Sequence, residues 1–108
     1  MDISFDHFKT MDLRVGEIKT VEDIEGADRI YKIGVDIGEE RSIIAGIKAF
    51  YSKEELIGKK VVVLANLETK TIRGHESRGM LLAAVKEDPR TLTVLTIDKD
   101  MPNGSRIS

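Results

Sequence analysis

The sequence predicts an all-β fold, and three observations support that prediction. Apolar and polar residues alternate along 30–38, β-branched residues dominate 60–67, and turn residues separate the apolar runs. Only one stretch, 52–58, breaks the pattern with the signals of a short helix. The length of 108 residues suits one domain, 1–108, with a single core.

The first half of the chain predicts a strand followed by a hairpin. The stretch LRVGEIKTVEDI (13–24) alternates over part of its length, and we expect Gly16 to form a bulge or bend there. IYKIGVDIG (30–38) alternates cleanly, so its apolar residues share one face. The turn GEER (38–41) joins it to the apolar run 41–47, which indicates a hairpin.

A short helix and a buried strand are predicted next. Ser52 and Glu55 have the spacing of a capping box, and Gly58 is a typical helix stop. KVVVLANL (60–67) is strongly apolar and β-branched, as expected for a buried strand.

The remainder predicts a polar connection and a second hairpin. Residues 68–79 form the connection, whose middle is compatible with extended backbone. The apolar runs 80–86 and 91–97 flank the turn EDPR (87–90). Ile107 is the candidate for a short final strand.

This inventory gives about five strands, with one short helix between the third and the fourth. Many short strands must close on themselves or form two packed sheets to protect their edges. A five-stranded, partly open OB-fold barrel fits these elements, and a small β-sandwich is the alternative.

Composition narrows the function classes. There is no cysteine, so disulfides and cysteine metal sites are excluded, and the two histidines lie far apart in sequence. We expect no metal, no cofactor and no membrane span, and a cytoplasmic protein. The net charge is −2, yet residues 48–86 contain 8 Lys/Arg and 4 Asp/Glu. A basic face for a polyanion is therefore compatible with the acidic total.

The stretch RGHESRGMLLAA (73–84) has the residues of a binding loop. Arg73 and Arg78 suit bidentate contacts to phosphate, Lys70 adds a point charge, and Asn66 can both donate and accept hydrogen bonds. The loop has no aromatic residue for base stacking, so recognition of a folded RNA by shape and phosphates fits best. Solvent-facing charges on a turn are the alternative.

Catalysis is the weaker interpretation of the same loop. Ser77 and His75 face the same way in an extended segment, but Glu76 between them points away, and no GxSxG elbow surrounds the serine. P-loop, GxGxxG and HExxH motifs are also missing. We therefore predict no catalytic residues.

Four stretches then carry a family resemblance: DLRVGEI (12–18), ADRIYKIGVDIGE (27–39), GKKVVVLANL (58–67) and RGHESRGMLLAA (73–84). Together they resemble the tRNA-binding domain family, which includes the C-terminal domain of many methionyl-tRNA synthetases and small free-standing tRNA-binding proteins. The resemblance implies an OB-fold that binds tRNA by shape and performs no chemistry. It also implies a homodimer joined partly through chain ends outside the barrel, because the chain stops near the end of the predicted barrel.

The resemblance also identifies candidate contacts. Arg14 matches the start motif, where a structural ion pair and an RNA contact are both compatible with the pattern. Met80 matches the Ser-x-Gly-Met element, although core packing is our preferred role for it. Two glutamates, Glu68 and Glu76, depart from a uniformly basic face. The predicted RNA-binding set is Asn66, Lys70, Arg73, Ser77, Arg78, Met80 and Lys86.

The leading hypothesis is therefore a tRNA-binding module, acting alone or with a methionyl-tRNA or other synthetase. A chaperone-like or protein-interaction OB-fold dimer without RNA binding is the second hypothesis. A hydrolase that uses Ser77 and His75 is a distant third.

Overall fold

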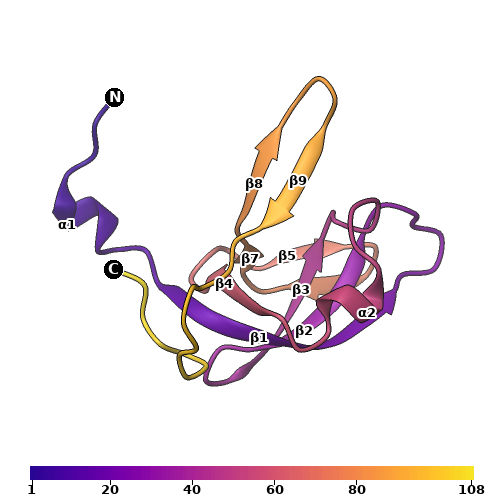
Figure 1. The fold of residues 1–108 in the computed structure, drawn as a ribbon, viewed down its shortest axis with the longest axis horizontal. Coiled ribbons are helices and arrows are strands. Elements are labelled where there is room, and N and C mark those ends of the chain that lie inside the picture. The colour runs from indigo at the N-terminus through magenta and orange to yellow at the C-terminus, as the bar shows by residue number, and fades with distance from the viewer.

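A computed structural model describes all residues, 1–108, and its centre is one antiparallel sheet of five strands (Figure 1). The sheet curls until β3 meets the far end: the Arg78 amide donates to the Ser42 carbonyl, and the Ile44 amide donates to Ser77 Oγ. The result is a nearly closed five-stranded barrel, which confirms the predicted class over the sandwich. Its strand order is β3 (Glu40–Ala45), β2 (Tyr31–Asp36), β1 (Leu13–Asp23), β4 (Lys60–Leu64) and β7 (Met80–Leu81).

The long strand β1 has its irregularity at a different place from the one predicted. Gly16 pairs in regular register with Val61 of β4, so the expected bulge at Gly16 is wrong. The register with β2 shifts instead between Ile18 and Thr20. Gly16 makes room for the core, because a Cβ there would lie 2.8 Å from Val35 Cγ2.

The first hairpin and the helix between β3 and β4 are as predicted. Strands β2 and β3 stay in register from Tyr31–Ala45 to Asp36–Glu40. Helix α2 (Lys53–Leu56) begins at Ser52, whose side chain and that of Glu55 form the reciprocal capping box. Leu56 points from this helix into the barrel and is fully buried.

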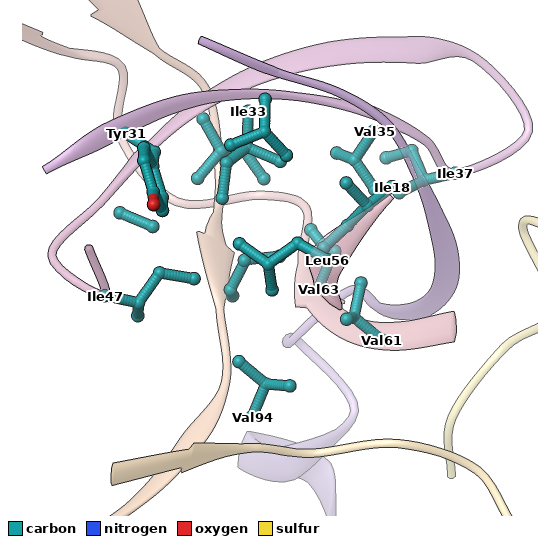
Figure 2. Close-up of a cluster of buried hydrophobic side chains, with 14 of the residues drawn as sticks. Ile18, Tyr31, Ile33, Val35, Ile37, Ile47, Leu56, Val61, Val63 and Val94 are labelled. Atoms are coloured by element: carbon teal, nitrogen blue, oxygen red, sulfur yellow. The ribbon is translucent and has the colours of Figure 1, made fainter. Parts of the chain in front are cut away.

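An aliphatic core fills the barrel (Figure 2). The alternation in β2 puts Tyr31, Ile33 and Val35 inside, where Val61 and Val63 of β4 meet them. The Tyr31 hydroxyl donates to the Tyr51 carbonyl, so the one aromatic core side chain with a polar atom has a partner.

The second half of the chain departs from the prediction in two places. The run 80–86 is two strands: β7 stays in the barrel, while β8 (Ala83–Lys86) pairs with β9 (Thr91–Val94) in a hairpin that projects from it (Figure 1). The polar connection contains a further hairpin of β5 (Lys70–Ile72) and β6 (His75–Ser77). Hydrogen bonds at Leu82 mark the split, because its amide donates to Val62 and its carbonyl accepts from Leu95.

The two chain ends lie outside the barrel on the same side (Figure 1). Helix α1 (Phe5–Phe8), which the sequence pattern did not predict, begins at the capping residue Ser4. The predicted final strand forms only an isolated bridge, Arg14–Arg106, supported by the Ile107 amide donating to Leu13. Neither four-residue helix has the length or hydropathy needed to cross a membrane.

Candidate nucleic-acid interface

The β5–β6 hairpin presents an arginine at its tip. Arg73 and Gly74 occupy the two turn positions with φ angles of 50° and 82°, as a two-residue hairpin turn with matching twist requires. A left-handed conformation is uncommon for arginine and costs on the order of 1 kcal/mol. The side chain reaches towards the β1–β2 loop: a Cβ added at Gly26 would lie 3.4 Å from Arg73 Nη1.

Three cations of this segment have no acidic partner. Lys70, Arg73 and Arg78 are exposed, and none of the ion pairs in the structure includes them. By contrast, Lys48 and Lys53 both pair with Asp23. The three free cations are therefore available to an external anion.

Arg78 combines a fixed backbone with a free side chain. Its amide donates to Ser42, and its carbonyl accepts from Arg41 Nη1 at 3.3 Å. Glu68 and Glu76 are exposed on the same connection, so the local positive charge is modest.

Ser77 has an internal role that its spacing from His75 did not suggest. The residue is only 6% exposed, and its Oγ accepts from the Ile44 amide at 2.9 Å. No hydrogen bond joins Ser77 to His75, so the nucleophile–base contact of the hydrolase hypothesis is not formed. The hydroxyl helps to join β6 to β3 where the barrel closes.

Asn66 is also engaged within the protein. Its Oδ1 accepts from the Asp12 amide at 2.9 Å, and its Nδ2 donates to the Thr10 carbonyl at 2.7 Å. Both ends of the side-chain amide thus hold the segment that leads into β1.

Arg14 makes the structural ion pair that was one of its two predicted roles. Its Nε and Nη2 both donate to the Asp12 carboxylate, at 2.9 and 2.8 Å. These hydrogen bonds hold the pKa of Asp12 below its ordinary value and raise the pKa of Arg14.

Met80 is not a core residue, so the preferred expectation for it is wrong. Successive residues of a strand face opposite sides, and Leu81 takes the buried position. Met80 therefore points outwards and is 43% exposed.

Met80 and Ile44 both line two neighbouring surface grooves. The first, which we name the β5 groove, has a volume of about 510 Å³ and is lined by Ile44, Leu67–Lys70, Ile72, Ser77, Gly79 and Met80. The second, which we name the β8 groove, has a volume of about 410 Å³ and is lined by Ile44–Ile47, Met80–Ala83, Val85, Arg90, Leu92 and Val94.

The structure thus brings most of the predicted set together but not all of it. Lys70, Ser77 and Met80 line the β5 groove, Arg73 lies in the turn of the β5–β6 hairpin, and Arg78 directly follows β6. Lys86 lies apart, at the end of β8 on the projecting hairpin. The sequence reasoning missed the apolar groove residues Leu67 and Ile72, whose signal was an apolar side chain within a polar connection. No His, Asp and Glu cluster suits a metal ion.

Comparison with known proteins identifies the family of this chain. Residues 13–106 match the family model described as "Putative tRNA binding domain". Curated relatives are the methionine–tRNA ligases of Thermococcus kodakarensis, 50% identical over 106 residues, and Methanothrix thermoacetophila, 51% identical over 105 residues. Each alignment covers 97% of this chain but only 14% and 15% of the respective ligase.

Solved structures agree over the whole chain. A MetRS-related protein from Pyrococcus horikoshii superposes with a TM-score of 0.92 at 35% identity, and both chains are covered completely. The chaperone CsaA from Bacillus anthracis gives 0.90 at 28% identity, again over both whole chains. With the family model matched over most of its length, the chain belongs to the tRNA-binding domain family.

Proposed function

We propose that this chain is a non-catalytic module that binds folded tRNA, alone or as an accessory to a methionyl-tRNA synthetase in the cytoplasm. The observation that carries the proposal is the group of three unpaired cations on and beside the β5–β6 hairpin, Lys70, Arg73 and Arg78. Arginine and lysine without internal partners suit phosphate oxygens. The similarity to methionine–tRNA ligases supports the proposed association with a synthetase, and this chain corresponds to a small part of each of those ligases.

The site residues act in two ways under this proposal. Lys70, Arg73 and Arg78 contact phosphates, and Met80 contacts the RNA from the β5 groove. Asn66 and Ser77 hold the surrounding backbone in place, since their polar atoms already bond to it. Lys86 offers a more distant charge on the projecting hairpin.

Charge-removing variants test the hairpin directly. We expect the double variant Arg73→Ala/Arg78→Ala to weaken tRNA binding roughly tenfold or more and to reduce the slope of log K against log salt by about 2, one for each lost phosphate contact. Gel-shift titrations at several salt concentrations give both quantities. The matched control is Lys59→Ala/Lys99→Ala, which removes the same charge outside the hairpin. Equal effects of the two double variants would reject the hairpin as the binding site.

We also propose that the chain is a homodimer. Helix α1 buries none of its residues, and Phe5 is 71% exposed. Phe5 stacks on Phe8, and together with Met11 and Ile107 they line a shallow groove of about 310 Å³ at the chain ends. A second copy would remove this apolar surface from water, in agreement with the dimerisation through chain ends that the resemblance implies.

One observation favours a second candidate function, a chaperone-like or protein-interaction module. The β8 groove has hydrophobic side chains at 10 of its 12 lining positions. An apolar segment of another protein would fit such a surface, and two similar structures bear the name chaperone CsaA. Binding of an apolar peptide that is insensitive to salt, with no binding of tRNA, would favour this candidate over the first.

A further inference from the structure

We propose that the β5 groove holds an unstacked nucleobase of the bound RNA, with an adjoining phosphate on Lys70. The inference rests on the proposed RNA-binding function and adds to it a contact that is not electrostatic. The groove is formed by segments distant in sequence: Ile44 comes from β3, Ile72 from β5 and Met80 from β7. Its volume of about 510 Å³ leaves room for a planar ring.

Four of the nine residues that line the groove are hydrophobic: Ile44, Leu67, Ile72 and Met80. Leu67 is 46% exposed and Met80 is 43% exposed, while Ile44 and Ile72 are half-buried. Methionine sulfur makes favourable contacts with aromatic rings, and its flexible chain adapts to their shape. Met80 and Leu67 therefore offer a base the surface that aromatic residues provide in other RNA-binding proteins.

The charges around the groove favour a nucleotide over an apolar peptide. Lys70 lines the groove with a free ammonium group. Arg73 in the hairpin turn and Arg78 after β6 are unpaired as well. The only carboxylate in the lining belongs to Glu68. A carboxylate can accept from the exocyclic amino group of a base. Four apolar side chains, a cation for the phosphate and an acceptor for an amino group together match one unpaired nucleotide.

Two variants of Met80 distinguish the base contact from the phosphate contacts by their effects on affinity and on the salt slope. Met80→Ala should weaken binding of folded tRNA about tenfold, the size of one lost base contact, and leave the salt slope unchanged. Met80→Leu keeps an apolar wall and should retain most of the affinity. The matched control is Met101→Ala, because Met101 is similarly exposed at 48% and lies outside the groove. Thermal melting of each variant, followed by circular dichroism, verifies that it is folded.

Photo-crosslinking provides a test that needs no variant. tRNA that contains 4-thiouridine should crosslink to the wild-type protein at Met80 or within 67–72, as mapped by mass spectrometry. Affinities of Met80→Ala and Met101→Ala that are equal, or crosslinks confined to other segments, would overturn the base contact while leaving tRNA binding intact. Absence of tRNA binding by the wild-type protein would instead reject the proposed function and this inference with it.

Discussion

Position 16 of β1 requires glycine because the packed core leaves no space for a side chain there. A Cβ there would lie 2.8 Å from Val35 Cγ2 and 3.0 Å from Ile37 Cγ2, and both side chains are fully buried. Closely packed neighbours of this kind cannot move apart without losing contacts of their own. The glycine therefore serves packing, not the strand irregularity that its position in the sequence suggested.

Substitution of Gly16 tests this packing. We expect Gly16→Ala to lower the free energy of unfolding by about 1–3 kcal/mol, the usual cost of overpacking a core. The control is Gly46→Ala, since a Cβ at Gly46 meets nothing within 4 Å, and this change should be neutral or slightly stabilising. Urea denaturation at equilibrium measures both. Equal midpoints for the two variants would contradict the packing role.

Single residues also show where sequence reasoning reached its limit. The exposure of Lys70, Arg73 and Arg78 could be predicted, because cations within a polar connection are visible in the sequence. The roles of Asn66 and Ser77 could not, because their partners Asp12 and Ile44 are 54 and 33 residues away along the chain. The presence of a polar side chain in a motif does not reveal whether that side chain already forms hydrogen bonds with the protein backbone.

At the level of elements, periodicity predicted the barrel strands and their hairpin, because one buried face imposes alternation. It failed for 80–86, where β7 and β8 follow each other without a turn signal. Both pieces contain apolar residues, and the hydrogen bonds of Leu82 with Val62 and Leu95, which lie between the two pieces, cannot be recognised from the sequence. Helix α1 was missed for a different reason: four residues are too few for a helical period.

Helix α1 provides a test of the proposed homodimer. If the chain ends form the dimer contact, Phe5→Ser/Phe8→Ser should convert the dimer to a monomer, since it removes two exposed aromatic rings from the contact. Analytical ultracentrifugation of the wild-type and variant proteins gives their masses. Ile57→Ser, which alters an exposed apolar residue next to α2, is the control and should leave the mass unchanged. A monomeric wild-type protein, or a variant that remains dimeric, would contradict the proposed contact.

For the whole molecule, the distribution of charge matters more than its total. The chain has a net charge of −2, and several of its carboxylates have partners within the fold. Asn103 donates to both Glu17 and Asp36. Its hydrogen bond is the largest cause of the lowered pKa of Glu17, whereas the pKa of Asp36 is lowered first by the Gly38 amide and then by Asn103. A hydrogen-bonded carboxylate keeps its full charge. The local group of unpaired cations at Lys70, Arg73 and Arg78 is therefore what favours RNA, and an acidic total charge does not prevent it.

Salt-dependent binding of folded tRNA tests the central claim most directly. Fluorescence anisotropy of labelled tRNA, titrated with the wild-type protein over a range of salt concentrations, should show saturable binding that weakens steeply with salt. Three phosphate contacts correspond to a slope of log K against log salt on the order of −3 per protomer. An unstructured RNA of equal length should bind more weakly. Absence of binding at low salt, or equal binding of the two RNAs, would contradict the account of a module that recognises folded tRNA.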